Sequence, residues 1–235
     1  MKMIEGGVTA AQGFVAGGIH CGIRKNKSKP DLAMIYSRTP CAAAAVYTQN
    51  LVKGAPILVT KKNIENGFAK AVICNSGNAN TCNADGVEKA QVMCQLTAQA
   101  LGIDPQDVVV ASTGVIGQTL PLEPIEAGIP GLVKVLSPKG STGAATAIMT
   151  TDTIAKEAAA EVEIGGKTVH MGGISKGSGM IHPNMATMLC FVTMFTDTSC
   201  NYGFYEHQGM KRRLEKKHVF NIKGQQAVMN FFIYD

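Results

Sequence analysis

The chain has 235 residues, 46% hydrophobic and 17% charged, which is the composition of an ordinary globular protein long enough to bury a core. Much of its net charge of +5 lies in the run Lys211–Lys217, and because a solvated helix face explains such a run more often than a nucleic-acid contact, we expect no nucleic-acid partner. No apolar run reaches the roughly 18 residues of a membrane span, and Met1–Glu5 lacks a signal-peptide core, so we expect a cytoplasmic protein with no membrane partner.

The first part of the chain has the pattern of a sheet. Val8–Ile23 and Leu32–Tyr47 carry alternating or continuous apolar positions bounded by Gly and Pro. The charged segment Arg24–Asp31 between them is typical of a turn. Two sheet segments joined by a turn are therefore predicted.

A strand and a helix are predicted next. Ala69–Cys74 is a short, buried-strand pattern that runs into Asn75–Asn80, a polar segment that we expect to be a loop. Helical spacing of apolar residues over Asn83–Leu101 then predicts a helix that ends at Gly102.

The middle of the chain predicts a strand followed by helices. Asp107–Ala111 is apolar and delivers Ser112-Thr113-Gly114 to its end. Helical segments are expected at Leu122–Ala127, at Leu132–Leu136 and from about Gly143 to Met149.

A hairpin leads into the most informative segment. Val162–Ile164 and Lys167–Met171 are joined by Gly165-Gly166, which favours a tight β-turn. Strand pairs and helices in this order indicate α+β layers rather than a doubly wound parallel sheet.

Residues 176–189 read Lys-Gly-Ser-Gly-Met-Ile-His-Pro-Asn-Met-Ala-Thr-Met-Leu, and an apolar strand-like run, Met188–Phe195, overlaps their end. Glycines and a proline turn place the hydroxyl of Thr187 directly after the small Ala186. A threonine hydroxyl needs a base to become a nucleophile, and an N-terminal threonine can use its own α-amine. Cleavage between Ala186 and Thr187 would create that amine; the alternative is an ordinary strand threonine.

Five stretches in this order resemble the bifunctional ornithine acetyltransferase/N-acetylglutamate synthase family of arginine biosynthesis. They are Gly6–Ala10 with Gly13-Phe14, Asn75–Asn80, Ala111–Gly117, Ile148–Thr153 and Lys176–Leu189. The likeness runs from about Gly6 to Asp197, whereas residues 198–235 form an unmatched tail with a different composition. Because chains of the family continue into a second half, we expect a truncated end here, with a lineage-specific C-terminus as the alternative.

The resemblance implies a fold and a processed chain. The fold is an αββα sandwich, similar to N-terminal-nucleophile hydrolases but connected differently. Self-cleavage at Ala186-Thr187 would give an α chain of residues 1–186 and a β chain that begins at 187. In the family these chains form an α/β heterotetramer.

The resemblance also implies roles for single residues. Thr187 would be the nucleophile, Thr113 and Gly114 the oxyanion hole, and Thr153 and Lys176, with Thr187, the substrate-binding residues. From spacing alone other interpretations stay open. Ser-Thr-Gly after a strand is more often a turn, Lys176 could be a solvated loop lysine, and Thr153 could belong to the C-terminal turn of a helix.

The activity implied is the transfer of an acetyl group from N-acetylornithine to glutamate through an acetyl-threonine intermediate. No cofactor is expected, although some members accept acetyl-CoA as the acetyl donor. The alternative is a catalytically silent, truncated relative, because the family's second half supplies a glutamate near the nucleophile and residues that hold the substrate.

Other site classes fit the sequence less well. Gly173–Gly177 matches the G-x-S-x-G motif of serine hydrolases, but that motif requires a helix directly after the serine, and Pro183 disfavours a long one. The seven cysteines and five histidines show no Cys-x-x-Cys pair and no metal-ligand spacing, so we expect no metal site.

Overall fold

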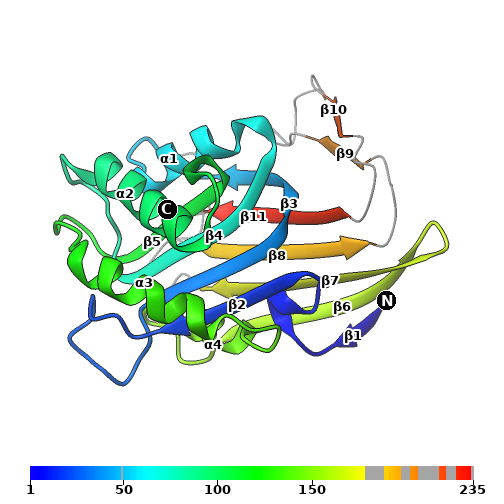
Figure 1. The fold of residues 1–235 in the computed structure, drawn as a ribbon, viewed down its shortest axis with the longest axis horizontal. Coiled ribbons are helices and arrows are strands. Elements are labelled where there is room, and N and C mark those ends of the chain that lie inside the picture. Colours follow the sequence, from blue (N-terminus) through cyan, green and yellow to red (C-terminus); the bar gives the residue numbers. More distant parts are fainter. Residues whose placement is uncertain (49, 178–187, 197–201, 206–216, 221–225, 234–235) are drawn as a thin grey trace.

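The fold was analysed in a computed structural model that describes residues 1–48, 50–177, 188–196, 202–205, 217–220 and 226–233. Helices occur between residues 55 and 147, and the elements described before and after them are mainly strands, in an α+β arrangement. Three of the helices, Ala55–Asn63, Gly86–Leu101 and Glu123–Val135, gather toward one side of a large twisted sheet (Figure 1). The predicted α+β class is confirmed.

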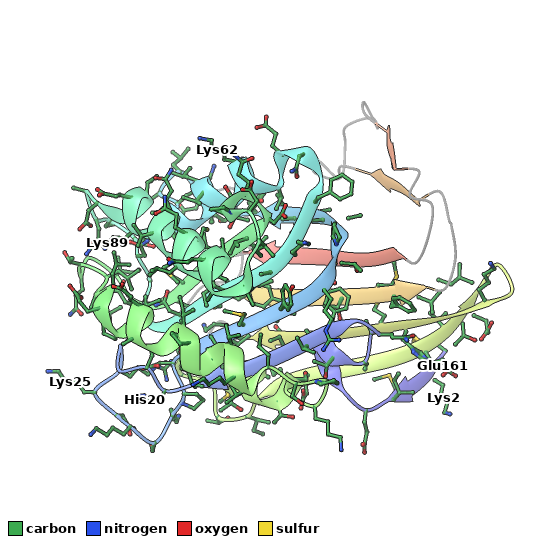
Figure 2. The ribbon with its side chains drawn as sticks, viewed as in Figure 1. Lys2, His20, Lys25, Lys62, Lys89 and Glu161 are labelled. Atoms are coloured by element: carbon green, nitrogen blue, oxygen red, sulfur yellow. The ribbon has the colours of Figure 1, made fainter. Side chains whose placement is uncertain are left out.

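The large sheet has nine strands in the order β1-β6-β7-β8-β11-β3-β4-β5, and β2 pairs with the first half of β3. Its strands are β1 (Lys2–Ile4), β2 (Phe14–Ile19), β3 (Leu32–Tyr47), β4 (Phe68–Asn78), β5 (Val108–Val115), β6 (Lys156–Ile164), β7 (Lys167–Lys176), β8 (Leu189–Thr196) and β11 (Gln226–Ile233). A separate pair consists of β9 (Tyr202–Tyr205) and β10 (Lys217–Phe220). At the β1 edge, Lys2 pairs in register with Glu161, and Figure 2 shows both at this end of the molecule.

Four helices and three short 3₁₀ turns connect the strands that the structure describes. The helices are α1 (Ala55–Asn63), α2 (Gly86–Leu101), α3 (Glu123–Val135) and α4 (Ser141–Ala147), and the turns are η1 (Gly7–Thr9), η2 (Ile64–Asn66) and η3 (Pro105–Asp107). Among the described residues, no helix combines the length and the apolar character needed to cross a membrane.

Strands β3, β4 and β5 bury both of their faces, because successive side chains of a strand point to opposite sides. On one face, Met34, Ile73 and Val110 pack against the helices α1, α2 and α3 in a core with Met93 and Ile125. This core is the interface between the helical layer and the first sheet layer.

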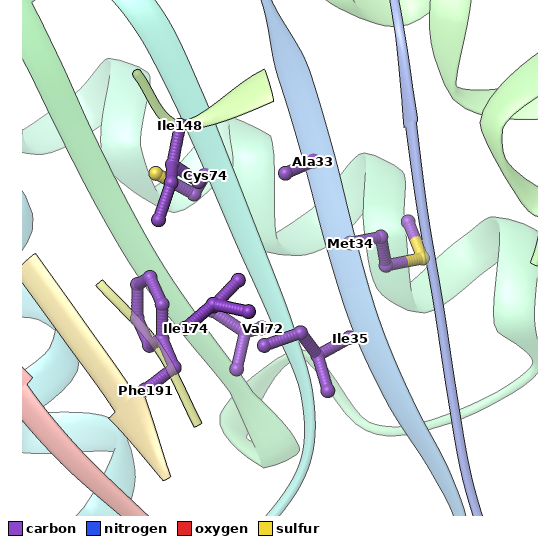
Figure 3. Close-up of a pocket in the computed structure, with 8 residues that line it drawn as sticks. All are labelled: Ala33, Met34, Ile35, Val72, Cys74, Ile148, Ile174 and Phe191. Carbon is purple, nitrogen blue, oxygen red and sulfur yellow. The ribbon is translucent and has the colours of Figure 1, made fainter. Parts of the chain in front are cut away.

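The other face of β3, β4 and β5 packs against β7 and β8. Val72 and Cys74 meet Ile174, Phe191 and, from the end of α4, Ile148 in a second core (Figure 3). The space between these side chains has no room for a water molecule. Helices, one part of the sheet and a second part of the sheet therefore lie in the order α-β-β, which is three of the four layers of an αββα sandwich.

Several predicted elements are confirmed, with shifted ends. Strands β2 and β3, the hairpin of β6 and β7, and strand β8 lie where the apolar patterns indicated. Helix α2 ends at Gly102, whose φ of 66° is the left-handed conformation that favours glycine at a helix end.

Other predictions were wrong in detail. Strand β4 continues through Asn78, so most of the expected Asn75–Asn80 loop is sheet. The two helical segments predicted near Leu122–Leu136 form the single helix α3, which accommodates Pro130 in its interior. Strand β1 and helix α1 were not predicted, although α1 has two helix signals: Pro56 in its first turn and two lysines in its last.

Strand β5 ends the sheet and is covered by α1. The Thr60 hydroxyl donates to the carbonyl oxygen of Val110 at 2.7 Å and accepts the Val110 N–H at 3.0 Å. Both backbone groups that Val110 would offer to a further strand are therefore occupied by one side chain.

Candidate active site

The Thr113-Gly114 pair lies near the end of β5, inside the strand rather than in a turn after it. Gly114 has a φ of +137°, and a Cβ at this position would lie 2.3 Å from the carbonyl carbon of Gly77. Gly77 and Gly114 are register partners on β4 and β5, and the register of β4 shifts directly after Gly77. Only glycine permits this approach of two backbones.

Thr113 is buried and is the register partner of Ser76. Because side chains alternate along a strand, Ser76 shares its face with Cys74, the face that packs against β7 and β8. The Ser76 hydroxyl donates to the carbonyl oxygen of Ala147 at 2.5 Å, and its N–H donates to the carbonyl oxygen of Asp31 at 2.8 Å. Ser76 therefore fixes the end of α4 beside the predicted oxyanion hole.

Lys176 ends β7 and is only 2% exposed, so it is not the solvated loop lysine that its residue type alone would favour. Its ammonium donates to the carbonyl oxygen of Gly177 at 2.9 Å. Burial lowers the pKa of Lys176. The nearby cations Lys156 and Arg24 lower it further, and the carboxylate of Asp152 opposes this shift. A buried ammonium with donors to spare can bind a carboxylate.

Asp152 connects the segment after α4 to the end of β7. Its Oδ1 accepts the Gly177 N–H at 2.8 Å and the Lys156 ammonium at 2.6 Å, and its Oδ2 accepts the Thr150 N–H at 3.4 Å. Burial raises the pKa of this carboxyl, but the three hydrogen bonds outweigh burial and hold the pKa below its ordinary value of 3.8. Asp152 is therefore a carboxylate at neutral pH.

Asp31 organises the loop between β2 and β3. Its fully buried carboxylate accepts the Cys21 N–H at 2.6 Å and the Arg24 N–H at 2.9 Å and lies 3.2 Å from His20, whose place on this loop is seen in Figure 2. The Arg24 guanidinium in turn donates to the carbonyl oxygen of Met149. A second contact thus holds the segment after α4.

The structure brings together four of the five sequence motifs that carried the family resemblance. The backbone of Gly77 abuts that of Gly114, Ser76 and Arg24 hold the segment that contains Asp152, and Asp152 holds the end of β7. Thr153 lies on this same segment, after α4 has ended, and is exposed. Ala186 and Thr187 lie outside the described residues.

Three contributors were missed by sequence reasoning: Arg24, Asp31 and Asp152. Signals for two of them were present. Asp152 and Lys156 are four residues apart, and Asp31 directly precedes a long apolar strand. The contact of Arg24 with Met149 spans 125 positions and left no local signal.

Three other site classes find no support in the described part of the chain: a serine-hydrolase nucleophile, a cysteine nucleophile and a metal site. Ser175 of the G-x-S-x-G match lies within β7, which pairs with β8, so it does not occupy the strand-to-helix turn of a serine hydrolase. Burial raises the pKa of the Cys74 thiol to about 12, which keeps this neighbour of Lys176 a thiol rather than a nucleophilic thiolate. Among the described residues no three His, Cys, Asp or Glu side chains gather as metal ligands would.

Comparison with known proteins identifies relatives of the chain. The model of the ArgJ family matches residues 15–213. The arginine biosynthesis bifunctional protein ArgJ of Symbiobacterium thermophilum is 55% identical over 195 residues, which are 82% of this chain and 48% of the relative. The Bacillus subtilis protein of the same name is 51% identical over 192 residues, 81% of this chain and 46% of the relative. The chain therefore spans about half the length of the curated relatives it matches.

Solved structures agree with the sequence comparison. The crystal structure of the arginine biosynthesis bifunctional protein ArgJ from Bacillus halodurans superposes with a TM-score of 0.73 at 43% identity, covering 78% of this chain and 97% of that one. Ornithine acetyltransferase of Mycobacterium tuberculosis, solved in complex with ornithine, gives a TM-score of 0.66 at 32% identity, covering 80% of this chain and 98% of that one.

Proposed function

The chain belongs to the ArgJ family, and from this membership we propose that it contributes the α chain and the start of the β chain of a glutamate N-acetyltransferase of arginine biosynthesis. The reaction moves an acetyl group from N-acetylornithine to glutamate, and acetyl-CoA is a further candidate donor. We also propose that the reaction takes place in the cytoplasm and that the processed chains assemble into an α/β heterotetramer.

The first chemical step is self-cleavage at Ala186-Thr187. The Thr187 hydroxyl oxygen attacks the Ala186 carbonyl carbon, an ester C–O bond forms, the peptide C–N bond breaks, and the hydroxyl proton passes to the leaving nitrogen. Water then hydrolyses the ester, which leaves a carboxylate on Ala186 and a free hydroxyl and α-amine on Thr187.

The second step is acetyl transfer. The new α-amine, with an ordinary pKa of about 7.7 to 8.0, accepts the hydroxyl proton as the Thr187 oxygen attacks the acetyl carbonyl carbon. Thr113 and the Gly114 N–H stabilise the oxyanion, the proton passes to the departing ornithine nitrogen, and the acetyl group stays on Thr187. The amine of glutamate then attacks the acetyl carbonyl carbon, the ester C–O bond to Thr187 breaks, and the proton lost by that amine returns through the Thr187 α-amine to the hydroxyl oxygen, while Thr153 and Lys176 hold the substrate.

One observation carries the proposal: a glycine that only a close backbone approach explains, Gly114, and a buried cation, Lys176, belong to one network of contacts around the end of α4. Leu189 is the register partner of Lys176. Thr187, the proposed nucleophile, precedes Leu189 by two positions in the sequence.

The lengths of the relatives support the proposed cut. This chain covers about half of the curated relatives but 97% and 98% of the two solved chains. Division of the relatives' polypeptide near the position of Thr187 would account for this difference.

A second candidate is a chain that is processed or folded but catalyses no transfer by itself, and the half-length match to relatives favours it. Acyl transfer needs the nucleophile, base, oxyanion donors and a substrate clamp held together, and a misplacement of about 1 Å can cost 100-fold in rate. Assay of the purified 235-residue chain with N-acetylornithine and glutamate separates the two candidates.

The proposed cut is tested by intact-mass measurement of the purified chain during incubation. We expect a fragment that begins at Thr187 and ends at Asp235. The Thr187→Ala variant should stay intact. The control is Thr151→Ala, which changes an exposed threonine on the segment after α4 and should still be cut. A fragment that persists in Thr187→Ala would refute the assignment of the nucleophile.

A further inference from the structure

We propose that Asp152 is a positioning residue that anchors Gly177, and that the rate of the cut at Ala186-Thr187 depends on this anchor. The inference rests on the proposed function for the reaction, but the anchor itself stands on contacts between described residues. Asp152 matches no role given by the family resemblance, which pointed instead to its neighbour Thr153.

The anchor is a charge-assisted hydrogen bond to the backbone. Asp152 Oδ1 accepts the Gly177 N–H at 2.8 Å, across 25 positions of sequence. Gly177 is the last described residue before residues 178–187, whose sequence contains the proposed scissile bond. A hydrogen bond from a backbone N–H to a carboxylate is stronger than one between neutral groups, so this contact fixes the backbone at Gly177.

The fit around Gly177 indicates a built contact rather than a chance approach. A Cβ on Gly177 would lie 3.2 Å from Asp152 Oδ1 and 3.4 Å from Lys156 Nζ, so the carboxylate and the ammonium both pack closely against the backbone at Gly177. The Asp152 side chain is 3% exposed, whereas that of Lys156 is 51% exposed. The acceptor of the anchor is thus held inside the protein and its counter-ion faces water.

The anchor also couples two parts of the proposed site. Asp152 Oδ2 accepts the Thr150 N–H, which orients the turn that leads to Thr153. Gly177 follows Lys176 directly, and its carbonyl oxygen accepts the Lys176 ammonium. One carboxylate therefore fixes the relative positions of the substrate-binding threonine segment and the buried cation.

The main alternative is that Asp152 serves only as the partner of Lys156 in a surface ion pair. Such pairs contribute little, and removal of either partner should then have the same small effect. The two roles separate experimentally because Lys156→Met removes the ion pair and leaves the Gly177 contact, whereas Asp152→Ala removes both.

The test uses the full 235-residue chain with three variants: Asp152→Ala, Asp152→Asn and Lys156→Met. Asp152→Asn keeps an oxygen of the same size but no charge, and it replaces the alanine variant should that one fail to fold. The readouts are hydrogen exchange of the Gly177 amide and the rate of cleavage at Ala186-Thr187 by intact mass.

We expect Asp152→Ala to lose protection of the Gly177 amide and to be cut roughly 10- to 100-fold more slowly, the effect of misplacement by about 1 Å. Asp152→Asn should fall between this variant and the wild type, and Lys156→Met should be cut within about twofold of the wild-type rate. Equal slowing by Lys156→Met and Asp152→Ala, or an unchanged Gly177 amide in Asp152→Ala, would overturn the inference. If the wild-type chain itself is not cut, the proposed function fails, and exchange of the Gly177 amide still decides the anchor.

Discussion

Gly114 on β5 approaches Gly77 on β4 so closely that its backbone leaves no space for a side chain. A Cβ on Gly114 would approach the Gly77 carbonyl carbon to 2.3 Å and the Asn78 nitrogen to 2.6 Å. A Cβ on Gly77 would meet Arg24 Cγ at 2.9 Å on its other side. The pair therefore sets the position of the predicted oxyanion hole by steric exclusion.

Gly114→Ala should destabilise the protein strongly, because it adds both a clash and a φ of +137° that an alanine rarely adopts. Backbone strain of this kind costs about 1 to 3 kcal/mol before the clash is counted. Gly117→Ala is the matched control: its φ is also positive, at +75°, but a Cβ there would meet no described atom within 4 Å. Urea unfolding of the two variants measures the difference, and equal losses would contradict the steric explanation.

Thr113→Val should slow cleavage at Ala186-Thr187 by about 100- to 1,000-fold if the Thr113 hydroxyl donates to the oxyanion. Valine keeps the shape of threonine, so the buried packing is preserved. Ser112→Ala controls for a lost hydroxyl on the opposite face of β5, since Ser112 Oγ is buried and has no hydrogen-bond partner in the described part of the chain. A Thr113→Val chain that is cut at the wild-type rate would remove Thr113 from the oxyanion hole.

Lys176→Met should weaken binding of N-acetylornithine or glutamate without loss of stability. One charge-assisted contact to a carboxylate contributes about 1.5 to 3 kcal/mol to binding, a factor of roughly 10 to 150 in affinity. Methionine fills much of the same volume and avoids the cost of burying an ammonium, so the free energy of unfolding should be unchanged or higher. Calorimetry with Lys134→Ala as an exposed control for net charge tests this; equal affinity in all three proteins would argue against a substrate contact.

Asp152 should contribute to the free energy of unfolding at neutral pH, and this contribution should be lost at acid pH. Because its pKa in the folded state lies below 3.8, the folded protein binds fewer protons than the unfolded chain as pH falls toward that range. Its contribution is therefore complete well above pH 3.8 and is lost as the pH falls through the folded-state pKa. Urea unfolding at a series of pH values should show a steeper acid loss in the wild type than in Asp152→Asn, and parallel curves would exclude this linkage.

Much of the fold could be predicted from sequence because its strands are apolar and glycine residues mark the turns between them. The hairpin of β6 and β7 turns at Gly165-Gly166, where both residues have positive φ, as the glycine pair indicated. The continuation of β4 through Asn75–Asn78 could not be predicted by polarity, because these residues are buried by tertiary contacts. The Asn75 side-chain amide donates to the carbonyl oxygen of Asn78, and this local hydrogen bond replaces one that the amide would otherwise make to water.

The candidate site was only partly visible in the sequence. Thr113, Gly114 and Lys176 were predicted from sequence motifs. The structure adds two facts that the motifs do not contain: Lys176 is buried, and the backbone of Gly114 contacts that of Gly77. Asp152 has one local signal, Lys156 four residues later, but its hydrogen bond to Gly177 across 25 positions leaves none. Long-range contacts of single polar atoms are the class of information that pattern reasoning lacks.

The contact of Thr60 with Val110 has a consequence for how the protein can assemble. A free edge strand recruits extended segments of other chains, and such recruitment leads to aggregation or to fibres. At Val110 the hydroxyl of α1 occupies the donor and the acceptor that an incoming strand would need. Growth of the sheet past β5 is thus blocked in the middle of the strand by one helical side chain, without a charge or a proline at the edge.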